Sequence, residues 1–478
     1  MGLRIGFVSA ELSPLAQSGG LGEAVSGLAR ALAARGHDVC CTLPAYRAVL
    51  GHPECPTLAE SGRVTLAFPH GELRGRFLAG TLAPRIRLRL LDLPELYERP
   101  GLYGDAGSSY WDNGLRFIAL ARAAASDAGA PRPDVLVAHD WHAALTPCLM
   151  RTVEGERWRG AGSVLVVHNN AHQGRFAAST FPLTGLPAGH FHPGGLEFFG
   201  DLSLLKAGLL FADRIVAVSP SYARELLEPP CGAGLEGVYR GRAENLTGIA
   251  NGIDVERYDP AADPALPSAY DAEHSNGKVA CRAALLGELG LSAPPPGRLL
   301  AVIGRLDAQK GWDVLEESLP ELVSHGASLA LQGDGDPALA SRLRAACARH
   351  PRRVSLFVGW DEARARRLYA GADAVLIPSR FEPCGLVQLV AQRYGALPVA
   401  HRVGGLSDTI VDRESGILFA PLSAGALVAA VDRAAALAAE RTPRALRRSL
   451  MSLDVSWAGP AARWEALLED VARRARAA

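Results

Sequence analysis

A single carboxylate stands in a loop that follows a predicted buried strand in the second half of the chain. Residues 378–386 read Pro-Ser-Arg-Phe-Glu-Pro-Cys-Gly-Leu. Open α/β sheets bind their ligands at the carboxyl ends of parallel strands, so we expect Glu382 at a binding site. The turn through Cys384 and Gly385 predicts a helix start, where the first backbone N–H groups have no partner within the helix and can bind a ligand. A carboxylate beside such amides suits a sugar. The alternative is an ordinary loop ion pair between Glu382 and Arg380.

Two cations stand five residues apart, Arg305 and Lys310, after another predicted strand and beside a glycine turn. They could hold a diphosphate from two sides, because guanidinium and ammonium groups form charge-assisted hydrogen bonds with phosphate. A solvated charged loop is the alternative. Further on, Gly404 and Gly405 follow a strand and precede a predicted helix, and paired glycines permit close backbone approach.

Predicted strand ends in the first half of the chain also carry polar residues. They are Gln17 with Gly19 and Gly20 before a helix, His139-Asp140-Trp141-His142, and His168-Asn169-Asn170. The helix after the glycines favours an anion at its N-terminus; a plain tight turn is the alternative. For the histidines we favour hydrogen-bonding roles over metal ligation, since no cysteine or carboxylate set accompanies them. Buried, satisfied histidines are the remaining alternative.

The elements that must position these residues are βαβ units. Short Val, Ile and Leu runs alternate with Ala- and Leu-rich amphipathic segments, which is typical of parallel sheets covered by helices. We expect a helix at residues 22–35 and strands at residues 4–9, 39–43, 135–138, 164–167, 215–218, 299–303, 328–331, 354–357, 374–377 and 397–400. Each half carries its own Gly-Gly-Leu sequence, which suggests a ligand held between two Rossmann-like halves.

The length of 478 residues predicts two domains, with boundary candidates at residues 251–276 and 294–297. A final segment with Trp457, Trp464 and Val471 at helical spacing must dock one apolar face on another element.

The charge balance is neutral, with 50 Lys plus Arg against 50 Asp plus Glu, so neither a nucleic-acid nor a membrane partner is expected. No signal peptide or membrane-length apolar stretch is evident, and we expect a soluble, cytoplasmic protein. The eight cysteines contain no Cys-x-x-Cys pair and predict neither a zinc ribbon nor a disulfide framework.

Eight motifs, taken in order, resemble one enzyme family. They are Ser18-Gly19-Gly20-Leu21-Gly22, His139-Asp140-Trp141-His142, Val167-His168-Asn169, Leu205-Lys206-Ala207-Gly208, Val218-Ser219-Pro220-Ser221-Tyr222-Ala223, Asn251-Gly252-Ile253-Asp254, and residues 305–311 and 378–386. From residue 4 to about residue 465, the chain closely resembles bacterial glycogen synthase and plant starch synthase.

The resemblance implies an α/β protein of the GT-B class, with two Rossmann-like domains facing a deep central cleft. Residues 1–250 would form the acceptor-side domain and residues 251–455 the nucleotide-sugar domain, while residues 456–478 would form a helix returning to the first domain. The implied reaction moves glucose from ADP-glucose, or alternatively UDP-glucose, to the non-reducing 4-OH of an α-1,4-glucan such as glycogen or a maltodextrin. It retains the anomeric configuration and needs no metal or organic cofactor.

The resemblance also implies residue roles. Arg305 and Lys310 would hold the donor diphosphate, Glu382 and the Cys384 and Gly385 amides would clamp the glucose hydroxyls, and His168, Asp140 and Asn251 would line the glucosyl site. Gln17, Gly19, Gly20, Leu386, Gly404 and Gly405 complete the implied donor-binding set. These roles suit the chemistry, since charge develops on the departing diphosphate while the sugar becomes oxocarbenium-like. The departing phosphate oxygen can take the acceptor proton, which would remove the need for a dedicated protein base, and neither Glu382 nor Asp140 is assigned as a nucleophile.

The chain departs from the family at Gln17, where a lysine is usual, and at Glu23, where aspartate is common. Loss of one charge-assisted contact should cost about 1.5 to 3 kcal/mol, which corresponds to a roughly 10- to 100-fold loss in donor affinity or in reaction rate. The alternatives are a compensated synthase, an altered donor or acceptor preference, or a weakened or non-catalytic glucan-binding relative. A glycoside hydrolase that uses Asp140 and Glu382 is a weaker alternative. Tyr110 and Trp111 could stack on the acceptor or simply anchor a loop.

Overall fold

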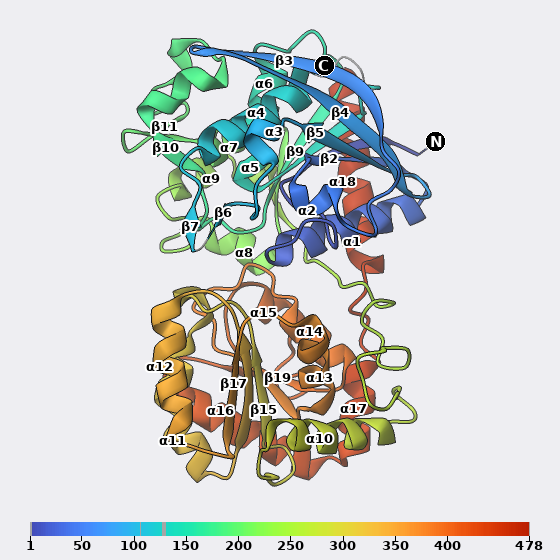
Figure 1. Cartoon of the computed structure of the whole chain (residues 1–478), viewed down its shortest axis with the longest axis vertical. Coiled ribbons are helices and arrows are strands. Elements are labelled where there is room, and N and C mark those ends of the chain that lie inside the picture. Colours follow the sequence, from blue (N-terminus) through green and yellow to red (C-terminus); the bar gives the residue numbers. More distant parts are fainter. Residues whose placement is uncertain (1, 106, 127–130, 478) are drawn as a thin grey trace. The chain divides into compact units, whose positions relative to one another are not determined.

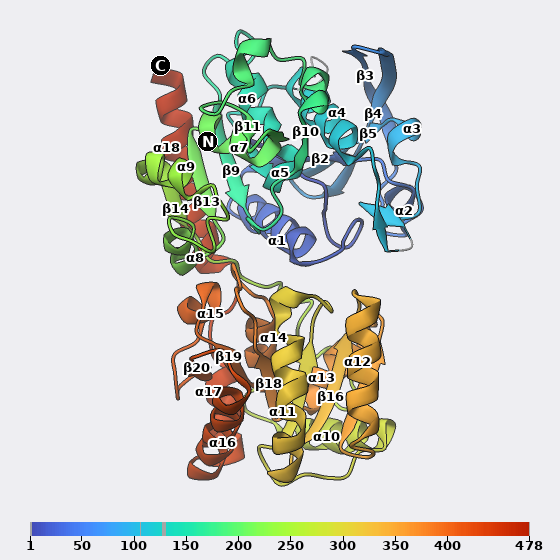
Figure 2. The ribbon, with the colours of Figure 1, turned by 90° about the vertical axis from the view of Figure 1, so that its left-hand side faces the viewer.

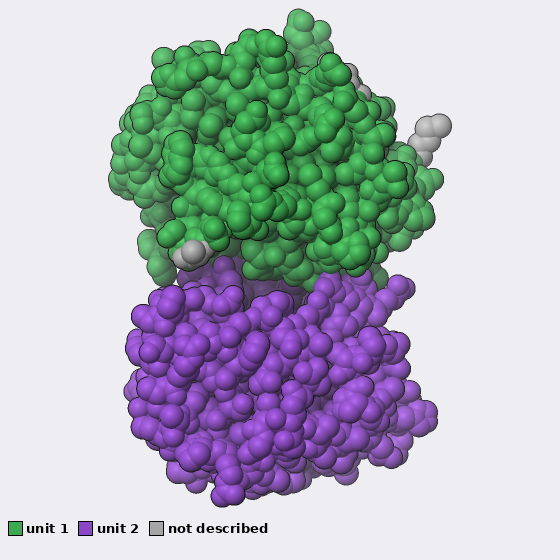
Figure 3. All heavy atoms as spheres, in the orientation of Figure 1, with its two compact units in different colours: residues 1–251, 457–478 green, residues 252–456 purple. Residues whose placement is uncertain are grey.

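The chain forms two compact units, each built around its own sheet, which is mostly parallel in unit 1 and wholly parallel in unit 2 (Figure 1). The computed structural model describes residues 2–105, 107–126 and 131–477. Unit 1 comprises Met1–Asn251 with Trp457–Ala478, and unit 2 comprises Gly252–Ser456, as coloured in Figure 3. The second boundary candidate, residues 294–297, lies inside unit 2.

Unit 1 contains a nine-stranded sheet. In spatial order its strands are β14 (Leu246–Gly248), β13 (Arg214–Ala217), β9 (Gly162–Val167), β8 (Val135–His139), β1 (Arg4–Val8), β2 (Asp38–Pro44), β5 (Ile86–Asp92), β4 (Gly71–Ala83) and β3 (Ala59–Phe68). The strands from β14 to β5 are parallel, while β4 pairs antiparallel with both β5 and β3. The carboxyl ends of β1, β8 and β9 therefore meet at one edge of the sheet, with β1 and β8 adjacent.

Helices cover both faces of this sheet (Figure 2). One face packs against α1 (Gly20–Ala34) and α18 (Ala458–Ala477), and the other against α4 (Asn113–Ser126), α5 (Asp140–Ala143) and α6 (Leu145–Arg151), with α7 (Leu204–Phe211) packed on α5 and α6. Shorter helices of this unit are α2 (Arg47–Leu50), α3 (Pro94–Tyr97), α8 (Pro220–Glu225) and α9 (Glu236–Gly241). Small sheets are formed by β10 (Arg175–Ala177), β12 (Asp201–Ser203) and β11 (Glu197–Phe198), and by β6 (Gly104–Asp105) and β7 (Ser108–Ser109).

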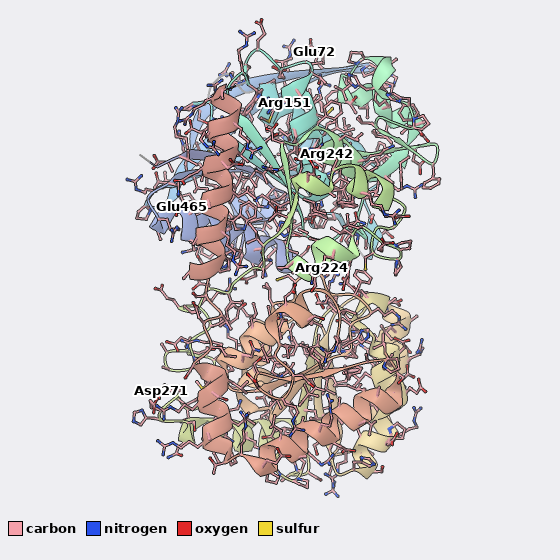
Figure 4. All side chains as sticks on the ribbon, turned by 180° about the vertical axis from the view of Figure 1, so that it is seen from behind. Glu72, Arg151, Arg224, Arg242, Asp271 and Glu465 are labelled. Carbon is pink, nitrogen blue, oxygen red and sulfur yellow. The ribbon has the colours of Figure 1, made fainter. Side chains whose placement is uncertain are left out.

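The last helix, α18, docks on unit 1 through the apolar face that its sequence predicts. Trp464, Leu468 and Val471 are buried against α1, β8 and β9. At the edge of this contact Glu465, labelled in Figure 4, accepts from Arg35 Nε at 2.8 Å, and its Oε1 lies 3.0 Å from His37 Nε2. The helix thus serves as a layer of unit 1 although its sequence follows unit 2.

Unit 2 contains a six-stranded, all-parallel sheet. Its spatial order is β17 (Val354–Val358), β16 (Ser328–Gly333), β15 (Leu299–Ile303), β18 (Ala374–Ile377), β19 (Leu397–His401) and β20 (Ile417–Phe419). One face carries α11 (Trp312–Ser324), α12 (Pro337–Ala348) and α16 (Ala424–Glu440); the other carries α10 (Asn276–Leu289), α13 (Glu362–Gly371) and α14 (Val387–Arg393). The remaining helices are α15 (Gly404–Thr409) and α17 (Pro443–Met451).

All ten predicted strands are found, with ends within two residues of those expected, and the helix predicted at residues 22–35 is α1. The central strands are buried on both faces, which is why their sequences are continuous apolar runs.

Within the described chain, no helix combines the length and apolar character that a membrane span requires.

Candidate functional site

Glu382 of unit 2 is a buried carboxylate fixed by two donors. Its side chain is only 9% exposed, and Oε2 accepts from Lys310 Nζ at 2.6 Å and from Ser379 Oγ at 2.9 Å. Arg380 instead forms an ion pair with Asp313, with Nη2 2.6 Å from Oδ2. The alternative that paired Glu382 with Arg380 is therefore wrong, because the guanidinium points to α11 and the ammonium of Lys310 takes its place.

Lys310 reaches Glu382 because its loop lies directly against the strand end at Pro378. Gly311, after Lys310, has φ +67°, and a Cβ at this position would overlap the Pro378 carbonyl oxygen. Only glycine combines this left-handed backbone with so close an approach. The Lys310 backbone N–H donates to Asp307 Oδ1 at 3.1 Å, which closes the turn. Arg305 is 46% exposed and lies 3.2 Å from Asp307 Oδ2, so its guanidinium stays at the surface of unit 2.

The glycine pair before α15 packs on the turn that contains Cys384 and Gly385. The Gly405 N–H donates to the Glu382 carbonyl at 3.0 Å, and a Cβ on Gly405 would overlap the Cys384 backbone. Gly385 adopts φ +72°, and Leu386 follows it as the residue before α14. The structure therefore brings the predicted unit 2 residues together: Arg305, Lys310, Glu382, Cys384, Gly385, Leu386, Gly404 and Gly405.

In unit 1, Asp140 follows β8 and holds the backbone after β9. Its Oδ1 accepts from the N–H groups of His168 at 2.7 Å and Asn169 at 3.3 Å. Burial raises the pKa of Asp140 to about 7, although the two N–H bonds act to lower it and Glu11 adds to the rise. Asp140 also has φ +55°, a left-handed conformation that costs a non-glycine residue free energy and is concentrated at functional sites.

The strand-end histidines form a neutral, hydrogen-bonded pair. His139 Nδ1 lies 3.0 Å from His168 Nε2, so one ring donates to the other. Burial lowers the pKa of His168 to about 3 and holds that of His139 well below its usual range. His142 stacks on Tyr103 with ring centroids 4.9 Å apart. Among the described residues, no group of three or more His, Cys, Asp or Glu side chains could hold a metal ion.

A buried carboxylate that the sequence analysis missed organises the first loop of unit 1. Glu11 is 2% exposed and accepts from the Ser18 N–H at 2.9 Å, Ser18 Oγ at 2.6 Å and the Tyr103 O–H at 2.7 Å. Because Ser18 precedes Gly19 and Gly20, Glu11 fixes the backbone that leads into α1. The signal was available, since Glu11 closely follows a strand end as Asp140 does.

Gln17 is turned back toward the first turn of α1. Its Oε1 accepts from Ser13 Oγ at 2.9 Å, and its Nε2 donates to the Gly19 carbonyl at 3.3 Å and to Glu23 Oε1 at 3.4 Å. The two departures from the family pattern, Gln17 and Glu23, therefore contact each other. Asn251 is half-buried and is the last residue of the first segment of unit 1.

The neighbouring aromatics Tyr110 and Trp111 differ in environment. The guanidiniums of Arg99 and Arg116 lie 4.8 and 4.9 Å from the Tyr110 ring centroid, and the Tyr110 hydroxyl accepts from the Gly101 N–H at 3.2 Å. Trp111 is 92% exposed. Tyr110 therefore anchors its loop, whereas the indole of Trp111 faces solvent.

Comparison with known proteins gives matches along most of the chain. Residues 4–241 match the family described as starch synthase catalytic domain, and residues 297–436 match glycosyl transferases group 1. The chain is 42% identical over 483 residues to the glycogen synthase of Rhodopseudomonas palustris, covering 97% of this chain and 98% of that protein. It is 42% identical over 496 residues to the glycogen synthase of Aromatoleum aromaticum, covering 100% and 98%. Among solved structures, the catalytic domain of starch synthase IV from Arabidopsis thaliana, bound to ADP and acarbose, matches with a TM-score of 0.90 and 28% identity, covering 99% of this chain and 100% of that one.

Proposed function

We propose that this chain, which belongs to the family of bacterial glycogen synthases and plant starch synthases and has the GT-B fold, transfers glucose from ADP-glucose to an α-1,4-glucan. The acceptor group is the non-reducing 4-OH of glycogen or a maltodextrin, and the anomeric configuration is retained. The observation that supports this best is the buried Lys310–Glu382 pair at the end of β18, beside the exposed guanidinium of Arg305. A diphosphate and a polyhydroxylated ring are the ligands that such a cluster suits.

In the proposed mechanism, unit 2 stabilises the leaving group. Arg305 and Lys310 meet the negative charge that grows on the diphosphate as the bond between glucose C1 and the phosphate oxygen breaks. Glu382 keeps the Lys310 ammonium in one position, because its buried Oε2 accepts from it at 2.6 Å. The Glu382 carboxylate and the backbone at Cys384 and Gly385 would bind the glucose hydroxyls.

The proposed role of the unit 1 residues is to bind the glucosyl group. His168, neutral at physiological pH, offers imidazole hydrogen bonding to a sugar hydroxyl without adding a positive charge near the oxocarbenium-like ring. Asp140 acts as a positioning residue, since its carboxylate holds the His168 and Asn169 backbone. The departing phosphate oxygen takes the proton of the acceptor 4-OH as the new C1–O4 bond forms, so no dedicated protein base is required.

We propose that residues 1–250 bind the acceptor and residues 251–455 bind the nucleotide sugar, with residues 456–478 as the helix that completes the first domain.

Gln17 is the position most relevant to donor choice. In the structure, its amide contacts Glu23 rather than presenting a cation. We therefore expect the donor phosphates to depend more strongly on Arg305 and Lys310 here than in relatives that carry a lysine at this position.

The test is a transfer assay with ADP-glucose and UDP-glucose against glycogen and short maltodextrins. We expect transfer from ADP-glucose, and a loss of about 10²-fold or more in Glu382→Ala, comparable to removing a preorganised transition-state contact. Arg342→Ala is the control, because Arg342 forms an exposed ion pair with Glu316 in unit 2, outside the loops of the candidate site; its rate should change less than about threefold. No transfer from either donor would refute the proposal, and release of free glucose from glycogen without a donor would indicate a hydrolase.

A further inference from the structure

A cavity of about 520 Å³ opens along the strands of unit 1. Its walls come from β1, β2, β4 and β5, together with Ala124 of α4, Pro131, Pro133 and Trp158. None of the residues assigned above to the donor or the glucosyl group lines it. The cavity is therefore a separate feature of the sheet, and its volume is in the range of small-molecule sites.

The cavity exists because one face of these strands is built from small residues and arginines. Two rows cross the strands in register: Gly6, Cys40, Arg87 and Thr81, and then Val8, Thr42, Arg89 and Ala79. Side chains two residues apart share a face, so both arginines project on the same side. The alternate positions of β2 and β5 are mainly apolar and buried: Val39, Cys41, Leu43, Ile86, Leu88 and Leu90, with Asp92 at the end of β5.

The lining residues carry a strong excess of positive charge. Five are arginines (Arg4, Arg85, Arg87, Arg89 and Arg157), and Asp38 is the one acidic residue among those described. Asp38 is already paired with Arg85, with Oδ1 2.8 Å from Nη1, and Arg4 lies beside Asp134 at 3.8 Å. The chain as a whole is neutral, with 50 basic and 50 acidic side chains, so this excess is local.

Two of these arginines have unused hydrogen-bonding capacity within the described chain. Arg87 is an exposed residue that lines the cavity, and its side chain forms no ion pair or hydrogen bond with the described residues. Arg157 has a buried Nε without a hydrogen-bond partner among those residues, and its guanidinium carbon lies 5.9 Å from the Trp158 ring centroid. Trp158 is fixed in the wall, since its Nε1–H donates to the Ala125 carbonyl at 2.9 Å. A buried donor without a partner requires an explanation, and a bound anion supplies one.

We propose that this cavity binds a small phosphorylated metabolite, with Arg87 and Arg157 as the phosphate ligands. Guanidinium groups match the planar, bidentate geometry of phosphate oxygens. The hydroxyls of Thr42 and Thr81 and the indole of Trp158 provide the polar and apolar contacts that a sugar or another short carbon skeleton requires. One of the lining strands, β1, leads at its carboxyl end into the loop that contains Gln17.

The test is isothermal titration of the full chain with inorganic phosphate, with a hexose monophosphate and with glucose, all in saturating ADP. ADP occupies the proposed donor site, and a parallel titration of Arg305→Ala identifies any phosphate that binds there instead. We expect both phosphates to bind and glucose not to bind. Tighter binding of the hexose monophosphate would identify a sugar phosphate as the occupant, and equal binding would identify free phosphate.

The variant Arg87→Ala/Arg157→Ala should weaken phosphate binding at least about tenfold, the loss expected for charge-assisted bonds. Arg63→Ala is the matched control, because Arg63 is an exposed arginine of the same sheet outside the cavity, and it should bind as the wild type does. Unchanged far-ultraviolet circular dichroism would show that each variant is folded. Wild-type-like phosphate affinity in the double variant, or no phosphate binding by the wild type at about 10 mM, would overturn the inference.

Discussion

Replacing Lys310 with methionine should destabilise unit 2 more than replacing Glu382 with glutamine, although both changes break the same ion pair. In Lys310→Met the Glu382 carboxylate keeps its charge, its 9% exposure and Ser379 as its remaining described donor. In Glu382→Gln the ammonium of Lys310 is left with 21% side-chain exposure, so water can reach it. The two variants therefore leave behind charges of unequal solvation.

The magnitude follows from that difference. Removing one partner of a buried pair costs about 3–5 kcal/mol, so we expect about 3 kcal/mol for Lys310→Met and about 1 kcal/mol for the better solvated lysine of Glu382→Gln. The double variant leaves no buried charge and should lose only about 1 kcal/mol, which implies a coupling energy of about 3 kcal/mol. At about 2–4 °C per kcal/mol for a domain of this size, Lys310→Met should lower the Tm of unit 2 by about 6–12 °C.

Differential scanning calorimetry of the four proteins measures these shifts, and the transfer assay follows activity in parallel. The double variant should regain stability but not activity, because both groups are proposed to act on the donor. The reasoning is refuted if the losses in stability are additive, or if Glu382→Gln is as destabilising as Lys310→Met. Additive losses would mean that the carboxylate in the folded unit does not depend on the lysine, and equal losses would mean that the two remaining charges are equally solvated.

Three further predictions concern unit 1. Gln17→Lys should raise kcat/KM for ADP-glucose about tenfold. This is the lower end of the range for a charge-assisted contact, because Glu23 lies 3.4 Å from the Gln17 amide and would partly neutralise the new ammonium. No gain or a loss would show that the loop has adapted to another donor. Burial raises the pKa of Asp140 to about 7, so the folded chain keeps a proton on this carboxyl that the unfolded chain releases above about pH 4. The stability that this difference contributes to the folded state is therefore lost as pH rises through 7. The Tm of Asp140→Asn relative to wild type should therefore increase between about pH 5 and pH 8, and a difference independent of pH would contradict the shift. A Cβ on Gly27 would overlap the Trp457 indole, so Gly27→Ala should cost unit 1 about 1–3 kcal/mol and leave the transition of unit 2 unchanged in calorimetry; equal losses in both units would count against this packing.

The predictions of family, GT-B fold and glycosyltransferase class from the sequence motifs are confirmed. Ten of the parallel strands were predictable because burial on both faces requires continuous apolar runs. The parallel strands β5, β14 and β20 were not predicted. The hairpin of β3 and β4 was not predicted, because its strands lack such continuous apolar runs. Its strands alternate buried and exposed residues, include glycines and charges, and pair antiparallel at the sheet edge.

The candidate site was predictable as a set of strand ends but not as a set of partners. Arg305, Lys310 and Glu382 were identified separately, since a loop sequence does not say which cation will meet which carboxylate. The choice of Lys310 over Arg380 depends on Gly311, whose left-handed backbone brings one loop against the other. Glu11 was overlooked because its importance comes from Tyr103, a partner that is distant in sequence. The residue roles themselves remain predictions.

The docking of α18 on unit 1 also sets an order in which the chain can fold. Unit 2 is continuous, from Gly252 to Ser456, so it can complete its core as soon as its last residue is synthesised. The sheet of unit 1 has all its strands earlier, but the surface on β8, β9 and α1 that receives Trp464 and Val471 stays uncovered until residues 457–478 follow. Synthesis from the N-terminus therefore makes the first unit to emerge the last to be completed. During that interval the exposed apolar surface is a natural target for chaperones.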